Sequence, residues 1–426
     1  MHKFAHITDC HLGSWRNHNL RELNVQAFEK AIDVCVEEKV DFIIITGDFF
    51  DVNVPQLAPV KRAVDILKKA LDAGIMIYMI YGSHDFNIVN VSMIDILHSA
   101  SLFIKPTDFV LDEGRIKLKF FVDPKTGAKI TGISGRKMGL DKEVYQLLDR
   151  NELEAEKGFK IFLMHTGVEE FMPLNLNVPD AVPFSEIPKG FSYYGGGHIH
   201  KKIERKLDDH SIMIYPGPIF GSTFQDLEET AAGEKRGFYI IRFDNKLVSY
   251  KFVELPTVEI ISRELSAGAL TSAQLDEKLK DFVSKLDANN KIVLVKLKGK
   301  VSGNIGNINF SRHNAELIKK GAIVSSINTA CLLTKESISI PACGTDKANI
   351  EKIVLSEKLK EFNLTMKCEK SVGDEFHSRF LGKGGENKAT SLLNTLKHER
   401  LENESNLNYD DRILAEAKSV IFSEQL

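Results

Sequence analysis

The sequence predicts a layered α/β fold with a second, smaller domain, and three features point to this class. From the N-terminus to about Glu254, apolar runs alternate with amphipathic helical stretches, an order typical of helices packed on a sheet. Runs such as Asp41–Thr46 are continuously apolar, as in strands buried on both faces. The chain of 426 residues also exceeds what one hydrophobic core usually supports.

The first expected elements alternate between strand and helix. Lys3–Thr8 has the pattern of a short buried strand, and Leu20–Glu38 has the apolar spacing of a helix. The elements expected after these are the strand Asp41–Thr46, the helix Val60–Ala73, and the strands Ile75–Ile80, Lys160–Met164, Ser192–Gly195 and Ser211–Tyr215.

After Leu255–Pro256 the pattern changes, and a small α/β domain is expected over residues 256–368. Thr271 and Gln274 predict a capping box at the start of a helix. The full expected order is strand Val258–Ser262, the capped helix, strand Ile292–Leu297, helix Asn314–Lys320, strand Ala322–Ile327 and a trailing charged helix near Ile350–Phe362.

The C-terminal part is predicted to be a linker followed by two helices. Residues 369–388 contain GKGGENK, which is typical of a flexible connector. Amphipathic helices are expected near Ala389–Glu402 and Asp410–Phe422. Such helices either fold back on the protein or bind a partner, and we expect partner binding through an apolar stripe of Leu392, Leu396, Ile413, Leu414, Ala417 and Ile421.

Composition excludes several classes of protein. Hydrophobic residues make up 43% and charged residues 27% of the chain, which argues against extensive disorder. The formal net charge of −3 neither favours nor excludes nucleic acid, because binding depends on local contacts. The five cysteines include no CxxC pair, which argues against a zinc ribbon or a disulfide framework. With no visible signal peptide or membrane-spanning run, a cytoplasmic protein with no membrane association is expected.

Five segments place metal-binding side chains directly after predicted strands. In α/β sheets, ligands collect beyond the carboxyl ends of the strands, so these segments are expected to meet at one edge. Residues i and i+2 of an extended segment project the same way and can reach one ion. The segments are Asp9-Cys10-His11, Gly47-Asp48-Phe49-Phe50-Asp51, Gly82-Ser83-His84-Asp85, Met164-His165 and Gly197-His198-Ile199-His200.

This ligand set predicts a two-metal phosphoesterase. Mixed carboxylate and imidazole ligands suit Mn, Fe or Zn better than Ca or Mg. Two ions roughly 3.5–4 Å apart can bridge a hydroxide and polarise a phosphate oxygen. Asp48 is the natural bridging carboxylate because the adjacent Gly47 permits a tight turn. Cys10 is expected to point away from Asp9 and His11, into the core.

The order DxH, GDxxD, GxHD, lone His and GHxH resembles the calcineurin-like metallophosphoesterase superfamily. Within it, the chain resembles the double-strand-break repair nuclease subunits of the SbcD, or meiotic-recombination-eleven, type. That narrower resemblance depends on ITDCHLG, ITGDFFD, YGSHD followed by SMIDIL, and a small domain after VELP. It implies a four-layer α/β/β/α sandwich over residues 1–255, a DNA-binding α/β cap over 256–368 and a partner-binding helical segment over 389–426.

The resemblance also implies a role for each residue of the motifs. One metal would be held by Asp9, His11, Asp48 and His200, and a second by Asp48, His165, His198 and Ser83. His84 matches the family's catalytic histidine, which contacts the scissile phosphate as general acid or electrostatic stabiliser. Asp85 is expected to orient the His84 imidazole.

Two positions depart from the family pattern. Ser83 stands where the superfamily usually has Asn, and a hydroxyl is a shorter and weaker ligand. The second metal is therefore expected to bind loosely or through water. Asp51 stands where many nucleases of this type carry His, and it agrees with the broader phosphatase pattern GDxxD.

The activity implied is that of an Mn-dependent DNA exonuclease and endonuclease in a double-strand-break repair complex. The resemblance further implies two Mn²⁺ per subunit (Fe, Zn or Mg fitting less well), a homodimer, DNA ends as substrate and a coiled-coil ATPase partner of the SbcC, ATP-binding-cassette type. Two alternatives stay open. A small-substrate metallophosphatase or phosphodiesterase would not need the cap or the terminal helices. A DNA-end-bridging scaffold would have lost catalysis through Ser83.

Several basic side chains are candidates for contacts with DNA. Lys201, Lys202 and Arg205 follow GHIH directly, and a solvated charged turn is the alternative. Lys296 and Lys298 alternate along a strand of the cap, on a face turned either to DNA or to solvent. Trp15 either stacks on a base or packs at the rim of the site.

Overall fold

The structure is a computed structural model that describes residues 1–86, 91–136, 141–173, 176, 178, 181–208, 210–268, 270–334, 385–398 and 406–422. The chain divides into two compact units, Met1–Leu332 and Leu333–Leu426. The helix expected near Ile350–Phe362 and residues 369–384 of the expected linker lie outside the described residues.

One sheet of the first unit has five strands in the order β13-β12-β1-β2-β3. Its strands are β1 (His2–Ile7), β2 (Phe42–Thr46), β3 (Met76–Ile80), β12 (Gly237–Phe243) and β13 (Leu247–Glu254). The first three are parallel, whereas β12 pairs antiparallel with both β1 and β13. Helices α1 (His18–Glu37) and α2 (Leu57–Asp72) lie between these strands in the chain, and α3 (Met93–Ser99) follows β3. The alternation predicted for the first five elements is confirmed.

A second sheet has six strands in the order β10-β11-β9-β8-β7-β6. Its strands are β6 (Phe121–Val122), β7 (Lys129–Ile133), β8 (Lys160–Met164), β9 (Tyr193–Gly196), β10 (Ile203–Lys206) and β11 (Ile212–Tyr215). The helices and separate hairpin of this region are β4 (Phe109–Asp112), β5 (Arg115–Leu118), α4 (Asp141–Gln146), α5 (Asn151–Ala155), η1 (Glu169–Phe171), η2 (Phe184–Glu186) and α6 (Phe224–Ala231).

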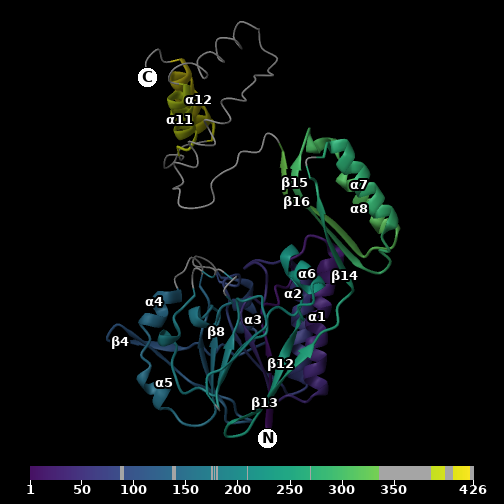
Figure 1. Ribbon diagram of the computed structural model, residues 1–426. Coiled ribbons are helices and arrows are strands. Elements are labelled where there is room, and N and C mark those ends of the chain that lie inside the picture. The colour runs from purple at the N-terminus through teal and green to yellow at the C-terminus, as the bar shows by residue number, and fades with distance from the viewer. Residues whose placement is uncertain are drawn as a thin grey trace. The chain divides into compact units, whose positions relative to one another are not determined.

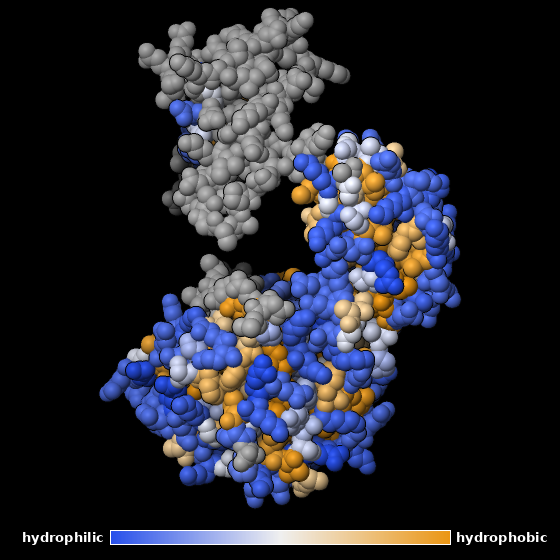
Figure 2. All heavy atoms as spheres, in the orientation of Figure 1, coloured by the Kyte–Doolittle hydropathy of each residue, from blue (hydrophilic) through white to orange (hydrophobic). Residues whose placement is uncertain are grey.

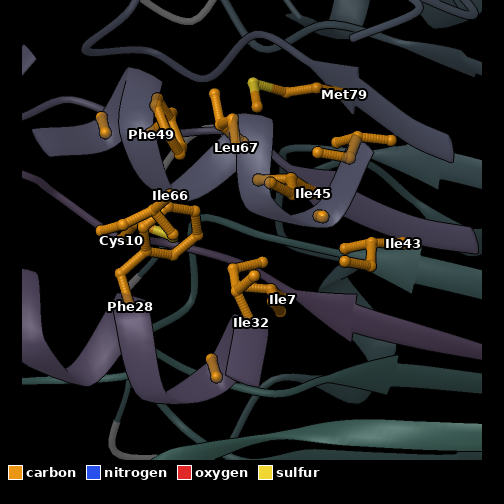
Figure 3. Packing of buried hydrophobic residues seen from close by; sticks show 14 of the residues in the cluster. Ile7, Cys10, Phe28, Ile32, Ile43, Ile45, Phe49, Ile66, Leu67 and Met79 are labelled. Atoms are coloured by element: carbon orange, nitrogen blue, oxygen red, sulfur yellow. The ribbon is translucent and has the colours of Figure 1, made fainter. Parts of the chain in front are cut away.

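The two sheets face each other, and helices cover their outer faces. In β2, Ile43 and Ile45 pack with Phe28 of α1 and Leu67 of α2, as Figure 3 shows. The alternate residues Phe42 and Ile44 point the other way and pack with residues of the second sheet such as Ile161.

A third cluster lines the outer face of the second sheet. It joins Phe162 and Met164 of β8 to Val144 and Tyr145 of α4 and Leu153 of α5. Helices α1 and α2 therefore form one outer layer and α4 and α5 the other (Figure 1). The four-layer α/β/β/α arrangement is confirmed.

The small α/β domain has a three-stranded sheet in the order β14-β15-β16. Its elements are β14 (Ile260–Ser266), α7 (Ser272–Lys285), β15 (Ile292–Val301), η3 (Ile305–Asn307), α8 (Phe310–Lys319) and β16 (Val324–Thr334). The predicted capping box is present, since Thr271 N–H donates to Gln274 Oε1 at 2.9 Å and Gln274 N–H to Thr271 Oγ1 at 3.3 Å. The expected domain boundary at 255 falls between two sheets, and the expected end at 368 is not among the described residues.

Strand β15 shows how this domain is attached to the first. Val293 and Val295 pack in its own core with Leu279 of α7. The alternate residues Ile292 and Leu294 pack instead with a cluster that includes Leu20 of α1 and Leu227 of α6. One strand therefore serves two apolar cores.

The C-terminal unit contains α11 (Gly385–Leu396) and α12 (Asn406–Phe422), which contact each other. Helix α11 begins at Gly385, so the last four residues of the linker predicted over 369–388 are helical. Ile413 and Ala417 are buried, whereas Leu396 is 54% and Leu414 53% exposed.

No helix among the described residues is long and apolar enough to cross a bilayer. On the face shown in Figure 2, hydrophobic patches are interspersed with hydrophilic surface.

Candidate metal centre

Loops that follow β1, β2, β3, β8 and β9 bring the candidate ligands together. Side-chain atoms within 4.8 Å of one another form three groups, namely Asp9–His11–His200, His11–Asp48–His84 and Asp48–His165–His198. The first and third contain ligands that the family resemblance assigns to separate metals. Asp48 and His11 each belong to two of the three groups.

The backbone at this edge is strained where it presents ligands. Asp9, His11, Asp48 and His198 have positive φ angles of 48°, 43°, 48° and 81°. Such conformations cost on the order of 1–3 kcal/mol each and persist where surrounding contacts hold them. The His11 N–H donates to the Asp48 carbonyl at 2.9 Å, which ties the first two loops together. Strain concentrated on the candidate ligands is typical of a functional site.

Three glycines of the motifs are required because the loops approach one another closely. A Cβ at Gly82 would lie 2.2 Å from Asp48 Oδ1, and one at Gly47 would lie 2.4 Å from His165 Nδ1. At Gly197 a Cβ would lie 2.0 Å from the Thr46 carbonyl oxygen. The glycines in GD, GSHD and GHIH therefore provide the space that lets three strand ends meet.

At each end of the cluster, two candidate ligand atoms lie close enough together to bind the same divalent ion. Nε2 of His11 and Nε2 of His200 are 3.1 Å apart, and Nε2 of His165 is 3.1 Å from Asp48 Oδ2. Two atoms that each bind one ion at about 2.1 Å stand roughly 3 Å apart when they are neighbours in its coordination sphere.

His165 gives the clearest evidence of a missing partner. Its Nδ1 lies 2.7 Å from the Thr46 carbonyl oxygen, which can only accept, so Nδ1 carries the proton. Its Nε2 is buried and faces Asp48 Oδ2 at 3.1 Å without the geometry of a hydrogen bond. This nitrogen either carries a second proton that pairs with Asp48 or, once that proton is lost, offers a buried lone pair to a metal ion, so the residues fit a metal.

The charges of this cluster are strongly coupled. Burial disfavours the charged imidazole, yet Asp48 raises the pKa of His165 to about 10. Burial also opposes the charge on His11, but Asp51 and Asp48 raise its pKa to about 8. Burial would raise the pKa of Asp48, but His165 and His11 lower it well below its ordinary range. For His198, burial and the charge of His165 lower the pKa. The carboxylates therefore attract positive charge, which protons or metal ions can supply.

His84 is exposed at the edge of the cluster. Its backbone N–H donates to Asp48 Oδ1 at 2.8 Å, and its Nδ1 donates to the Asp51 carbonyl at 2.6 Å. These two bonds fix the residue and leave Nε2 available to a ligand. Ser83, the preceding residue, is half-buried in the same loop.

The expectation that Asp85 orients the His84 imidazole is corrected. The two Asp85 oxygens accept from the backbone N–H groups of Gly82, Phe49 and Phe50 at 2.9, 3.1 and 3.0 Å. Burial and the nearby Asp48 raise the pKa of Asp85 to about 6. Asp85 therefore clamps the second loop to the third, and the Asp51 carbonyl takes the orienting role.

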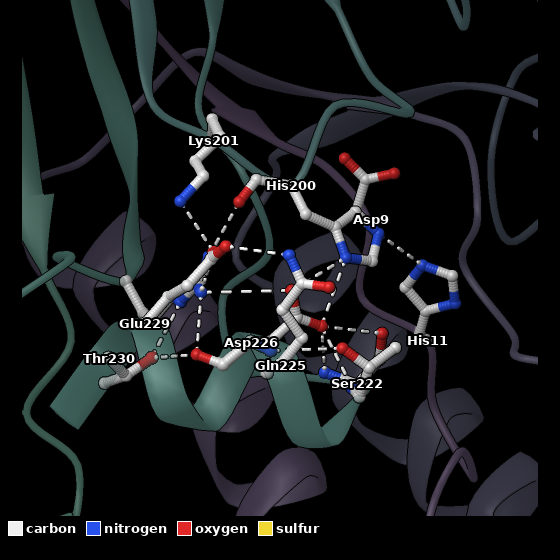
Figure 4. Close-up of polar contacts among 12 residues, drawn as sticks. Asp9, His11, His200, Lys201, Ser222, Gln225, Asp226, Glu229 and Thr230 are labelled. Carbon is white, nitrogen blue, oxygen red and sulfur yellow. Dashed lines mark hydrogen bonds and ion pairs between the residues drawn. The ribbon is translucent and has the colours of Figure 1, made fainter. Parts of the chain in front are cut away.

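Asp51 and Asp226 were not among the predicted site residues. Asp51 Oδ1 lies 3.3 Å from His11 Nδ1, although the sequence marked this position only as a departure from the family pattern. Asp226 contacts His200 (Figure 4). The pattern Thr223-x-x-Asp226 predicts a helix start, but nothing local in the sequence places it beside His200.

Of the basic side chains predicted to contact DNA, two pair with carboxylates and three are exposed. Lys201 pairs with Glu229 at 2.7 Å, and Lys296 pairs with Glu228 at 3.1 Å. The exposed side chains among the candidates are Lys202, Arg205 and Lys298. Trp15 donates to the Gly221 carbonyl at 2.9 Å and packs against the cluster that joins the two domains, which favours packing over base stacking. Cys10 is buried in the core as expected.

The family model described as calcineurin-like phosphoesterase matches residues 2–202. The DNA double-strand break repair protein Mre11 of Sulfurisphaera tokodaii is 32% identical over 305 residues, covering 68% of this chain and 70% of that protein. The protein of the same name from Methanocaldococcus jannaschii is 26% identical over 376 residues, covering 84% and 89%. The chain therefore belongs to the calcineurin-like phosphoesterase family and, within it, resembles the Mre11 proteins of archaea.

Proposed function

We propose that this protein is a manganese-dependent DNA exonuclease and endonuclease, the nuclease subunit of a DNA double-strand break repair complex. The observation that carries the proposal is the cluster of carboxylates and imidazoles centred on Asp48. Its chain also resembles proteins named for DNA double-strand break repair over more than two thirds of their length.

The candidate ligands divide into two sets that share Asp48. Asp9, His11, Asp48 and His200 would hold one Mn²⁺, and Asp48, His165, His198 and Ser83 would hold the other. When bound, the two ions would supply an activated hydroxide and polarise an oxygen of the scissile phosphate. Asp48 fits the shared position because its Oδ2 lies 3.1 Å from Nε2 of His165 and 3.7 Å from Nε2 of His11.

His84 is the residue of this chain assigned to the substrate. Its imidazole is exposed beside the cluster, and its Nδ1–H is already committed to the Asp51 carbonyl. The protonated ring would contact the scissile phosphate and stabilise the leaving oxygen, either by charge or by donating a proton.

The partners are proposed from the parts of the chain outside the metal cluster. The cap and the exposed Lys202, Arg205 and Lys298 would contact the backbone of DNA near its ends. Leu396 and Leu414 on α11 and α12 would bind the coiled coil of an ATP-binding-cassette-type ATPase. A homodimer is part of the same proposal. The proposed location is the cytoplasm, in association with DNA.

The test is cleavage of end-labelled single- and double-stranded DNA with Mn²⁺, alongside p-nitrophenyl phosphate esters. The proposal expects DNA digestion by the unaltered protein and its loss in His84→Ala. His210→Ala, which removes an exposed imidazole of the same domain outside the metal cluster, is the matched control and should cleave normally. Turnover of the esters without DNA cleavage would indicate a small-substrate phosphatase. Inactivity on every substrate would instead favour a scaffold impaired at Ser83.

A further inference from the structure

The imidazole of His200 connects the metal cluster to helix α6. Its Nε2 lies 3.1 Å from Nε2 of His11, inside one of the candidate metal groups. Its Nδ1 lies 3.1 Å from each carboxylate oxygen of Asp226, near the start of α6 (Figure 4). One ring therefore has one nitrogen at the candidate metal site and the other on a carboxylate that no family motif of this chain includes.

The Asp226 carboxylate is buried, with the residue only 3% exposed, and it is fixed on several sides. Its Oδ2 accepts from the backbone N–H groups of Ser222 and Thr223 at 3.0 and 2.9 Å. The guanidinium of Arg236, 4% exposed, approaches its Oδ1 to 3.9 Å. A carboxylate held in this way cannot turn away from His200.

Arg236 fixes the backbone of both residues as well. Its Nη1 donates to the His200 carbonyl at 3.0 Å, and its Nη2 donates to the Asp226 carbonyl at 2.9 Å. Its Nε donates to Thr230 Oγ1 at 2.9 Å, one turn further along α6. The guanidinium thus ties the loop that carries His200 to the helix that carries Asp226.

We propose that Asp226 is a positioning residue that holds His200 in the tautomer and orientation needed to bind metal. An ionised carboxylate only accepts hydrogen bonds, so it keeps the His200 proton on Nδ1 and the lone pair on Nε2. A ring free to change tautomer would place a proton on Nε2 for part of the time, and that nitrogen could not then bind an ion. This inference rests on the proposed metal site.

Asp226 also has a structural role that the test must separate. It is part of the capping box of α6, in which Thr223 Oγ1 accepts from the Asp226 N–H at 3.1 Å. The Thr223 hydroxyl takes part in the helix cap and can be removed alone, which gives a matched control for the loss of the cap.

The substitution Asp226→Asn separates the two roles chemically. The single oxygen of the asparagine side chain can still accept from the Ser222 and Thr223 N–H groups. The asparagine NH₂ group then faces His200 Nδ1 as a donor, which favours the His200 tautomer with its proton on Nε2. The size of the side chain and the cap acceptor are kept, while the hydrogen bond that sets the tautomer is reversed.

The test measures Mn²⁺ binding to the full chain by isothermal titration without DNA, together with thermal unfolding of the metal-free protein. We expect Asp226→Asn to lower the affinity for one of the two Mn²⁺ ions by roughly 10- to 100-fold. Thr223→Ala should lower the unfolding temperature but leave both affinities unchanged. Unchanged Mn²⁺ binding in Asp226→Asn, or an equal loss in Thr223→Ala, would overturn the proposal.

A second comparison shows whether Asp226 acts through His200. Adding Asp226→Asn to His200→Ala should weaken Mn²⁺ binding no further, because the residue it positions is already gone. A further loss as large as in the unaltered background would also overturn the proposal. Mn²⁺ binding is measured without DNA, so the role of Asp226 is decided by the affinities alone. A protein that binds both ions but cleaves no DNA would contradict only the nuclease proposal.

Discussion

At the scale of single residues, the candidate metal centre brings buried carboxylates and imidazoles of opposite charge together. Asp48 is almost fully buried and surrounded by the imidazoles of His11, His165 and His84. Burial lowers the pKa of His165, but the charge of Asp48 outweighs it and raises the pKa to about 10. Without a metal, the carboxylates therefore keep the imidazoles protonated. A divalent ion would replace those protons, because a metal ligand must be deprotonated.

This exchange predicts that Mn²⁺ binding releases protons at neutral pH. The raised pKa values, about 10 for His165 and about 8 for His11, mean that both rings are charged below those values in the metal-free protein. The apparent affinity for Mn²⁺ should therefore rise as the pH rises from 6 towards 8. Titration calorimetry in two buffers of different ionisation enthalpy measures the released protons, and identical heats in both buffers would contradict this prediction.

Ser83 provides a prediction about the second ion. A carboxamide reaches further than a hydroxyl and is a stronger neutral ligand, so Ser83→Asn should tighten the weaker Mn²⁺ site. An improvement of about tenfold, equivalent to about 1.4 kcal/mol, is expected. The dependence of DNA cleavage on Mn²⁺ concentration measures it, with Ser101→Asn as a control at an exposed serine outside the candidate metal groups. An Mn²⁺ dependence that is unchanged or weaker in Ser83→Asn would contradict this prediction.

At the scale of elements, the site is made by strand ends that meet. The sequence places the ligand motifs after strands, and the parallel order of β1, β2 and β3 and of β8 and β9 explains why they converge. The roles of Asp226 and Arg236 could not be predicted, because they depend on α6 lying beside His200. Asp85 was misassigned because adjacency to His84 in sequence does not show which way its carboxylate points.

The close approach of the loops predicts a sharp difference between two neighbouring glycines. In Gly197→Ala the new methyl would lie 2.0 Å from the Thr46 carbonyl oxygen and 2.7 Å from His165 Nδ1. It should abolish Mn²⁺ binding and cost on the order of 1–3 kcal/mol of stability. Gly195→Ala meets only side chains at 3.3 Å and should retain Mn²⁺. Titration and thermal unfolding of both variants check this, and normal Mn²⁺ binding by Gly197→Ala would contradict it.

At the scale of the whole molecule, continuously apolar strands made the layered fold predictable. In β2 every residue is buried because both faces are covered, and the sequence shows this directly. Other strands carry no such signal. Every residue of β4 is exposed, β13 has no buried residue, and β12 pairs with β1 from more than 230 residues away. Edges and long-range pairings depend on tertiary context that a local pattern does not contain.

The terminal helices provide a prediction about assembly. Removal of residues 385–426 should leave Mn²⁺-dependent DNA cleavage intact but abolish binding to the coiled-coil ATPase. Leu414→Glu should do the same without loss of folding, because this side chain is exposed, whereas Ile413→Glu should unfold the helix pair because Ile413 is buried. Co-purification and circular dichroism distinguish these outcomes. Normal ATPase binding by Leu414→Glu and by the truncated protein would place the interface elsewhere.

In the proposed nuclease, two metal ions that share Asp48 as a ligand enable one buried cluster to cleave DNA phosphodiesters. The most direct test of this claim is the rate of cleavage of end-labelled double-stranded DNA against Mn²⁺ concentration, for the unaltered protein and Asp48→Asn. We expect a rate that rises more steeply than in proportion to Mn²⁺ at low concentration and falls roughly a hundredfold or more in Asp48→Asn. Cleavage that persists in Asp48→Asn, or that needs no divalent metal, would contradict the claim.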